Sequence, residues 1–469
     1  MPAREGFRAN LPAGGIKAAL IGGNTIGASI REATARSDGY RHIDTPRLIG
    51  RLQELNTNTY FYGVWDSATD WDDLREEFLP AAQEIGLKVI PYLVPPSETD
   101  LNGRASRPYI MDYVAWARAH AELSLEYPNL IGWSIDDFEF DMNAKLFTHE
   151  YMTQMRETQD AINPDLGFLT CAYWGAATSP EFLDKYGPFI DGIVYPYLDG
   201  HNHNTQVTST VKSDLDAIRE VAEPRGIETI LLVYAGRFLT SQLRPTETYA
   251  AECVRAGVEH AAEGKIAGVV AYGTQVDGAP TPNSENLAMY GTGRLSLAAP
   301  YHSVAKTGTY GEGWQTVVVD PDSPRYELSF WHYRLFTSNV PAPGDYEFRV
   351  LVDDEEVWAS DVRGEPWALW IQGKGLQGPV DITPYLKGKT SARLAFRLTA
   401  ERDVSSRYVD VGIDHLETVG FTIADPGFEE DGPWEFVRGG NGPILASIDH
   451  FVPDRPERIF RAVSEEFGR

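Results

Sequence analysis

The first 295 residues alternate between two spacings of apolar side chains. Helical stripes such as Leu48, Leu52 and Leu55 recur every three or four residues. Between the stripes lie short apolar runs typical of buried strands: KAALIGG, TYFYGVW, KVIPYLV, LIGWSID, LGFLTCAYW, DGIVYPYL, IETILLVYAG and KIAGVVAYG. These eight strands separated by helices predict an α/β fold, a (β/α)8 TIM barrel spanning residues 1–295. No GxGxxG follows an early strand, which disfavours an open doubly wound sheet.

The remaining residues show the two-residue period of strands. Tyr346, Phe348, Val350 and Val352 alternate with other positions, and similar alternation recurs at 394–398 and 409–413. This period, with regular turns, predicts an all-β, jelly-roll-like sandwich at 311–455. The segment 296–310 is expected to be a linker, and PERIFRAVSEEFGR (456–469) a tail with the pattern of a short helix.

The net charge narrows the range of partners. The chain has 68 acidic and 41 basic residues, a formal net charge of −27. Such a field repels phosphate backbones and anionic lipids, so neither nucleic acid nor a membrane is expected as a partner. No apolar run reaches the length of a membrane span, and MPAREGFRANLPAGG has no signal-peptide pattern. The chain as written is therefore expected in the cytoplasm, or outside the cell if a leader has been removed.

Motifs for metals and cofactors are weak or missing. Cys171 and Cys253 form no CxxC, so two buried free thiols are expected. His201 and His203 have an H-x-H spacing, but a metal-dependent amidohydrolase barrel would have its H-x-H after the first strand, a lysine on the fourth and an aspartate ending the eighth, and the chain has none of these. A solvated loop, or a histidine that bonds substrate, is the favoured interpretation. There is also no Walker loop and no Gly-x-Ser-x-Gly elbow. No metal, cofactor or acyl-transfer chemistry is therefore expected.

The strongest candidate chemistry follows the fourth strand, in IGWSIDDFEFD. In this type of barrel the active site lies at the carboxyl ends of the strands, where the following loops converge. Alternation predicts that Ile131, Trp133 and Ile135 face the helices. Asp136 then turns into the barrel mouth, with Asp137 beside it. Like charge and partial burial raise the pKa of one member of such a pair, which provides a proton donor at neutral pH.

This aspartate pair is the predicted catalytic centre. Glu139 and Asp141 continue the acidic run, but a helix cap or a solvated loop explains them better. A hydrolase that gets no help from its substrate needs a further carboxylate, about 5 Å away for retention or roughly 6.5 to 9.5 Å away for inversion. Asp199 is the first candidate for that catalytic role, followed by Glu98 and Asp66.

Aromatic and hydrogen-bonding side chains recur at the ends of the other strands. Rings offer flat apolar faces to a sugar, while phenol, carboxylate and guanidinium groups bond its hydroxyls. A carbohydrate is therefore the predicted partner. The predicted substrate-binding residues are Tyr62, Trp65, Asp66, Tyr92, Glu98, Tyr173, Trp174, Tyr195, Tyr197, Tyr234, Arg237 and Tyr272.

The Asp-Asp pair that closes the fourth strand, followed by an apolar residue, resembles the O-GlcNAcase type of glycoside hydrolase. More loosely, it is similar to other substrate-assisted hexosaminidases. The resemblance implies that Asp136 orients and polarises a 2-acetamido group of the substrate, whose oxygen attacks the anomeric carbon. It also implies that Asp137 is the general acid and later the base. The C-terminal sandwich similarly resembles carbohydrate-binding-like modules.

Glycoside hydrolysis by carboxylate acid and base catalysis is the leading hypothesis. Retaining, inverting and substrate-assisted mechanisms are all open at this point. The alternative is a non-catalytic carbohydrate-binding protein that keeps a barrel cleft. A sugar isomerase or lyase is less favoured, because it would use a metal-carboxylate cluster or a well-placed Lys or His base, and the sequence shows neither.

Overall fold

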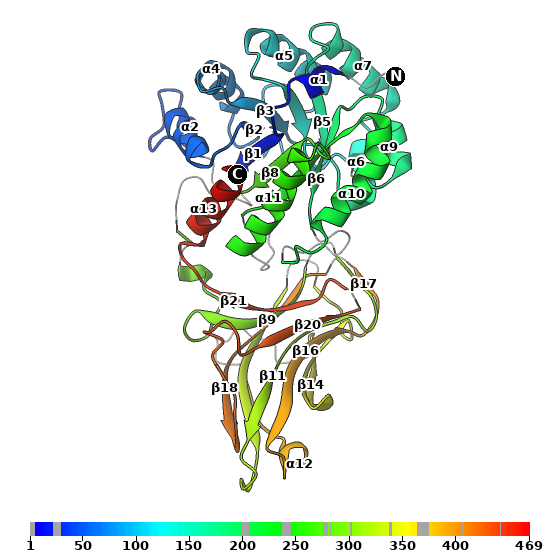
Figure 1. Cartoon of the computed structure of the whole chain (residues 1–469). Helices are drawn as coiled ribbons and strands as arrows, with labels where there is room; N and C mark the ends of the chain where they lie inside the picture. Colours follow the sequence, from blue (N-terminus) through cyan, green and yellow to red (C-terminus); the bar gives the residue numbers. More distant parts are fainter. Residues whose placement is uncertain are drawn as a thin grey trace.

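Eight parallel strands close into a barrel in the order β1 to β8 (Figure 1). The computed structural model describes residues 5–469 except 22–29, 140, 199–205, 237–244, 275–279, 282, 301–302, 337–339, 364–374, 406 and 441. Closure pairs β1 with β8, from Ile16 opposite Gly268 to Leu20 opposite Tyr272. The predicted (β/α)8 barrel is therefore confirmed. Its strands are β1 (Ile16–Ile21), β2 (Thr59–Val64), β3 (Lys88–Leu93), β4 (Gly132–Ile135), β5 (Gly167–Cys171), β6 (Gly192–Pro196), β7 (Glu228–Tyr234) and β8 (Gly268–Tyr272).

Helices connect successive strands and cover the outside of the barrel (Figure 1). After β2, α3, a π-helical turn η1 and α4 follow one another without a break. No helix among the residues described is both long and apolar enough to cross a membrane. The main connecting helices are α2 (Thr45–Glu54), α3 (Asp70–Asp73), η1 (Leu74–Phe78), α4 (Leu79–Glu84), α5 (Tyr113–Glu126), α7 (His149–Asp160), α9 (Pro180–Tyr186), α10 (Val211–Ala222) and α11 (Glu247–Ala262).

The eighth position of the helical ring is filled from the far end of the chain. The predicted tail forms helix α13 (Arg455–Phe467), which packs against α11 and returns to the barrel after the sandwich (Figure 1). Its Phe460 and Val463 are buried in the same cluster as the helix-facing side chains of the barrel. On its other side, Arg51 of α2 forms an ion pair of 2.8 Å with Glu457. The C-terminal tail, residues 456–469, therefore packs as part of the barrel although it follows the sandwich in the sequence.

Strand side chains divide between two apolar clusters. Alternate residues of each strand enter either the barrel interior or the layer beneath the helices, as the two-residue period requires. Trp133 and Ile135 lie beneath the helices, as predicted. The prediction for Ile131 is wrong: it lies in the interior cluster, because it precedes β4 and does not follow the alternation of that strand.

Residues after the barrel form two large antiparallel sheets that share one core, and a short two-stranded sheet of β10 (Val304–Ala305) and β17 (Val404–Ser405). The predicted alternation of β13 and β16 holds, since Phe348 and Phe396 are both fully buried. The expected linker is partly wrong: residues 296–299 belong to β9, where Leu295 and Leu297 already enter the sandwich core. Every residue of β9 is buried, including the polar Arg294 and Ser296, so the strand does not show a simple contrast between buried apolar and exposed polar positions. One sheet runs β14 (Glu355–Asp361), β13 (Tyr346–Val352), β16 (Ser391–Ala400), β11 (Tyr310–Val319) and β19 (Phe421–Thr422), with β20 (Glu435–Gly439) also paired to β11; the other runs β15 (Leu376–Asp381), β12 (Glu327–Phe336), β18 (Val409–Val419), β9 (Gly293–Ala299) and β21 (Leu445–His450).

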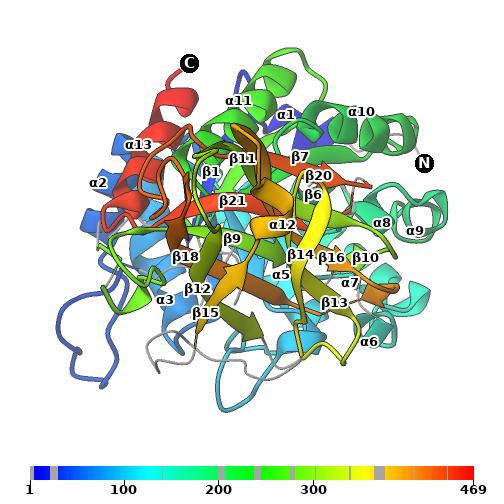
Figure 2. The ribbon, with the colours of Figure 1, turned by 90° about the horizontal axis from the view of Figure 1, so that it is seen from below.

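The sandwich lies on the side of the barrel where the strands end. Helix α1 (Glu5–Ala9) closes the opposite side, because its Phe7 packs in the barrel interior with Ile16 at the start of β1. Figure 1 shows α1 at the top of the molecule and the sandwich at the bottom. Seen from below, the sandwich overlies the middle of the barrel and the barrel helices surround it (Figure 2). Any ligand that reaches the barrel mouth therefore approaches beside this second domain.

Candidate active site

Asp136 is held at the carboxyl end of β4 by its neighbours on β3. Its backbone N–H donates to the carbonyl of Leu93 at 2.9 Å, which continues the strand pairing by one residue. The hydroxyl of Tyr92 donates to Oδ1 at 3.1 Å, and Arg104 donates to Oδ2 at 3.2 Å. Because 15 % of the Asp136 side chain stays exposed, the carboxylate can still be reached by a ligand.

Asp137 sits where the strand gives way to loop, in an uncommon backbone conformation. Its φ is +35°, in the region that residues with a Cβ seldom adopt, at a typical cost of about 1–3 kcal/mol. Two contacts hold it there: its N–H donates to Oδ1 of Asp136 at 3.1 Å, and its carbonyl accepts from Asn143 at 2.8 Å. The chain thus turns both carboxyl groups toward the same region.

Glu98 completes a cluster of three carboxyl groups, which we call the carboxylate cluster: Asp136, Asp137 and Glu98. Glu98 ends the short 3₁₀ turn η2 (Pro96–Glu98) after β3 and forms a hydrogen bond with the side chain of Asp137. A hydrogen bond between two carboxyl groups requires a proton on one of them. Glu98 also forms an ion pair with Arg104.

Burial and like charge raise the pKa values of both aspartates. Burial, with the nearby charge of Glu98, raises the pKa of Asp136 to about 6, although Arg104 and Tyr92 oppose this rise. Burial, with the charge of Asp136, raises the pKa of Asp137 well above its usual range. The two aspartates therefore differ in acidity: the pKa of Asp137 is raised the further, and Asp136 is the more acidic partner.

Arg104 is the important residue of the site that the sequence did not reveal. Its guanidinium lies 4.5 Å from the centre of the Trp65 ring and pairs with both Glu98 and Asp136. It belongs to the irregular connection between β3 and α5, where no periodic pattern marks any side chain as inward-facing. The only signal was its charge within a loop at the correct end of the barrel.

Cys171 is a buried free thiol, as predicted, and it lies beside the carboxylate cluster. Its Sγ and carboxylate oxygens of Asp136 and Asp137 all lie within 4.8 Å of one another, a grouping that could in principle hold a metal ion. Two observations do not fit that use. Arg104 already supplies a cation to Asp136, and burial raises the pKa of the Cys171 thiol well above its ordinary value, so the thiol stays neutral.

Five of the predicted aromatic residues line the barrel interior near this cluster. Trp65, Tyr92, Tyr234 and Tyr272 belong to the interior apolar cluster, and Tyr173 packs against it. Their polar groups meet as well: the Tyr173 hydroxyl is near enough to Asp137 to oppose the rise in the pKa of that carboxyl group, and it lies 3.5 Å from the hydroxyl of Tyr234. Rings and hydroxyls thus surround the two aspartates as the sequence suggested.

For four other residues predicted to bind substrate, the prediction is wrong, because their side chains point away from the barrel interior. Tyr62 packs beneath the helices, with its ring centre 5.1 Å from that of Phe78. Tyr195 and Tyr197 likewise point outward to α10, where Tyr195 donates to Asp214 at 3.2 Å. These tyrosines have the outward parity of their strands. Trp174 begins the short helix α8 (Trp174–Ala177) and packs against the same outer cluster.

The remaining candidates lie at the edge of the site or outside the described residues. Asp66 is exposed on the loop after β2, and its backbone N–H donates to Asp70 at 2.8 Å. Glu139 is partly buried and accepts the backbone N–H of Tyr173 at 2.7 Å, so its carboxylate faces another strand end and is neither the helix cap nor the solvated loop residue expected. Asp199, Arg237, His201 and His203 lie outside the residues that the structure describes.

Comparison with known proteins gives similarity of structure alone. No family model matches the chain, and no curated protein matches it by sequence. Several similar solved structures are glycosidases by name, and one is an aldolase. Sequence identities this low leave the activity of the chain to be decided by its own residues. Examples are a glucosidase from Croceicoccus marinus (11% identity, 82% of this chain and 99% of that chain, TM-score 0.38), a calcium-binding mutant of β-glucuronidase 2 from Bacteroides uniformis (8%, 85% and 65%, 0.41) and an HpcH/HpaI aldolase from Desulfitobacterium hafniense (9%, 57% and 89%, 0.32).

Proposed function

We propose that this chain is a glycoside hydrolase in which Asp137 donates a proton to the departing glycosidic oxygen. The single observation that carries the proposal is the arrangement of charge in the carboxylate cluster. Arg104 pairs with Asp136 and Glu98, while Asp137 lies between these two carboxylates and has no cation of its own among its described contacts. Asp137 is therefore the group that holds a proton at neutral pH, and a general acid needs that proton.

Asp136 has the complementary role in this proposal. Its hydrogen bonds from Tyr92 and Arg104 stabilise the ionised form, so it can orient and polarise a group of the substrate that develops positive charge. Glu98 lies within hydrogen-bond distance of Asp137 and is therefore too near to act as the second carboxylate across a sugar ring, which would be about 5 Å or more away. We therefore take the attacking group to be a 2-acetamido oxygen of the substrate itself, as the resemblance to O-GlcNAcases implies; Asp199, which lies outside the described residues, is the alternative second carboxylate.

The experiment compares Asp137→Asn with the wild type on aryl and alkyl glycosides, each supplied in a 2-acetamido and a 2-hydroxy form. Loss of a general acid typically lowers kcat by about 10²–10⁴-fold, and the loss is greater for alkoxide leaving groups than for nitrophenolate, which departs without a proton. The Michaelis constant should change little, because Asn keeps the size of the side chain.

Asp165→Asn is the matched control, because Asp165 is exposed in the loop before β5, at the amino end of the barrel. Its rates should equal those of the wild type on every glycoside. Equal rates for Asp137→Asn and the wild type on alkyl glycosides would remove Asp137 as the acid. Turnover of 2-hydroxy glycosides at the rate of their 2-acetamido counterparts would remove the substrate-assisted mechanism and keep the hydrolase. Binding of sugars without turnover of any of them would instead support a non-catalytic carbohydrate-binding protein.

A further inference from the structure

His42 lies between two carboxylates that come from different parts of the chain. Nδ1 is 2.5 Å from Oδ1 of Asp73 on α3, and Nε2 is 2.8 Å from Oδ2 of Asp38, four residues earlier in the loop. Ionised carboxylates only accept hydrogen bonds, and a neutral imidazole has one N–H to give. Both contacts are satisfied together only when the ring is an imidazolium.

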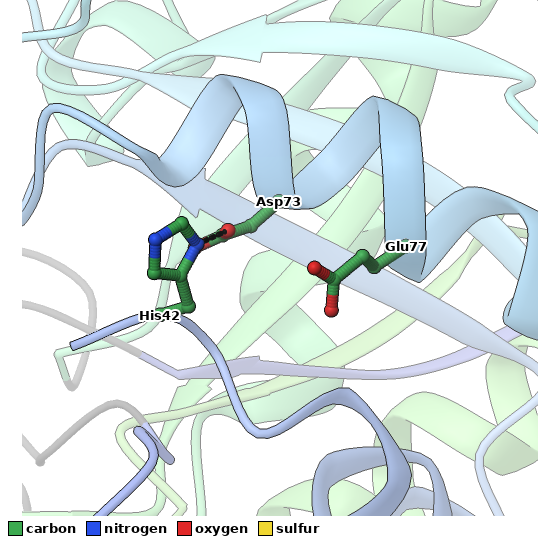
Figure 3. Close-up of side chains that lie close together, drawn as sticks. All are labelled: His42, Asp73 and Glu77. Carbon is green, nitrogen blue, oxygen red and sulfur yellow. Dashed lines mark hydrogen bonds and ion pairs between the residues drawn. The ribbon is translucent and has the colours of Figure 1, made fainter. Parts of the chain in front are cut away.

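The segment that carries His42 is attached to the α3 region by charge. This segment, residues 30–44, follows β1 and is closed on itself by a bridge between Arg31 and Ile43. Arg31 donates to Asp70 at 2.7 Å, and Arg36 contacts Glu77 of η1 at 2.5 Å. Figure 3 shows Asp73 and Glu77 reaching from the helix toward His42, with an interaction drawn between His42 and Asp73.

We propose that segment 30–44 is a latch that responds to pH through His42. As an imidazolium, His42 holds this segment against α3 beside the barrel mouth. When the ring loses its proton, the segment is released. Asp73 is only 2% exposed, and its carboxylate accepts from Thr69 and from the backbone N–H of Ile43, both at 3.1 Å. Its other oxygen faces His42. Deprotonation leaves the ring a single N–H, so one of the two carboxylates loses its donor and the buried Asp73 loses the cation that balances its charge.

The charged groups around His42 together raise its pKa above the ordinary value for histidine. Burial opposes the charged ring, but Asp38 and Asp73 outweigh it and raise the pKa of His42, while the nearby Arg36 acts in the opposite direction. Glu32 and Glu77 add negative charge on the two sides, and both are paired with Arg36. Because the folded-state pKa is raised above about 6.5, the latch is fully closed below that pH and opens as the pH rises through the folded-state pKa.

The latch is connected to the candidate site through Asp70. Its Oδ1 receives Arg31 from the latch segment, and its Oδ2 accepts the backbone N–H groups of Trp65 at 3.2 Å and Ser67 at 2.8 Å. Trp65 in turn lies against the Arg104 guanidinium. Any effect of the latch on turnover rests on the function proposed above, whereas the opening of segment 30–44 does not.

A metal ion is the competing occupant for this place. Atoms of His42, Asp73 and Glu77 lie within 4.8 Å of one another. Arg36, however, contacts Glu77 through both terminal nitrogens and places positive charge next to that space. Both ring nitrogens of His42 also already face carboxylates. The residues therefore satisfy one another without an ion.

Hydrogen exchange of the whole chain, measured by mass spectrometry from pH 5.5 to 9, tests the latch without reference to activity. Amide protection is measured in peptides covering 30–44 and corrected for the intrinsic exchange rate at each pH. As the pH rises, this protection should fall, and the size of the fall should be about the factor by which folding raises the proton affinity of His42. His42→Gln should show low protection that does not change with pH. Asp38→Asn removes one of the two carboxylates and should move the midpoint to lower pH.

His149→Gln is the control, because His149 is exposed on α7 and should behave as the wild type does. Wild-type protection that is constant across this pH range, or a pH dependence that survives in His42→Gln, would overturn the latch. The series is repeated with Zn²⁺ or Mn²⁺ at the alkaline end. An ion that restores protection in the wild type but not in His42→Gln would show a metal site in place of the latch.

Discussion

Arg104 donates a hydrogen bond of 3.2 Å to Asp136, so a loop that follows β3 supplies the cation for a carboxylate at the end of β4. The same guanidinium pairs with Glu98 and lies over Trp65. One positive charge is therefore shared by two of the three carboxyl groups of the cluster. In the function proposed above, the third, Asp137, is the proton donor, and the difference between the two neighbouring aspartates depends on a residue that is distant from them in sequence.

Replacing Arg104 by Gln should shift the pH dependence of hydrolysis. In the wild type, kcat/KM should fall below about pH 6, because Asp136, whose pKa is raised to about 6, must be ionised. Arg104 lowers the pKa of Asp136, so its removal should move this acid limb to higher pH. A tenfold gain in the proton affinity of Asp136 should lower kcat/KM about tenfold on the acid side and by less at pH 8. The measurement is kcat/KM on a cleavable aryl glycoside from pH 4.5 to 9.

Arg118→Gln provides the control for this experiment, because Arg118 is exposed on α5 and its replacement removes the same charge from the molecule as a whole. Its profile should superimpose on that of the wild type. A variant of Arg104 whose rate falls by the same factor at every pH would show that Arg104 only helps to hold the substrate.

The sequence could predict the barrel and the place of the aspartate pair at the end of β4, because both follow from local periodicity. Asp136 has the inward parity of its strand, and so do Tyr92 and Tyr173. The same parity, applied to each strand, excludes Tyr195 and Tyr197, which alternate with the inward-facing Val194. Proximity to a strand end is therefore a weaker guide to the site than the face of the strand on which a residue lies.

The contributions of Arg104 and α13 could not be predicted in this way. An irregular loop has no period, so the direction of its side chains is decided by partners that approach from other strands. A terminal helix with one apolar face shows that it will be buried but not against which element. Both depend on contacts between segments far apart in the chain, which a single sequence does not encode in a readable pattern.

Removal of divalent metal should leave hydrolysis unchanged. The proposed chemistry uses the proton of Asp137 and the charge of Arg104, and the neutral Cys171 thiol is a poor ligand beside them. We expect equal kcat/KM before and after dialysis against EDTA, with the unfolding temperature measured in parallel to detect a structural ion. A loss of turnover that Mn²⁺ or Zn²⁺ restores, with unchanged unfolding temperature, would place an ion among Asp136, Asp137 and Cys171 and exclude the proton-transfer arrangement.

Truncation of Phe460 should destabilise the barrel even though the residue lies beyond the sandwich in sequence. Phe460 is 3% exposed within the barrel's helix-facing cluster, and the Arg51 guanidinium lies 3.7 Å from its ring centre. Phe460→Ala should lower the free energy of unfolding by roughly 3–5 kcal/mol, the usual cost of emptying such a site. Arg461→Ala, on the same helix but with a side chain that is 74% exposed, should change it by less than about 0.5 kcal/mol. Hydrogen exchange of peptides from β1 and β8, monitored as the urea concentration increases, reports the unfolding of the barrel directly. If Phe460→Ala left the protection of those strands intact while the sandwich unfolded, α13 would not be the eighth helix of the barrel in energetic terms.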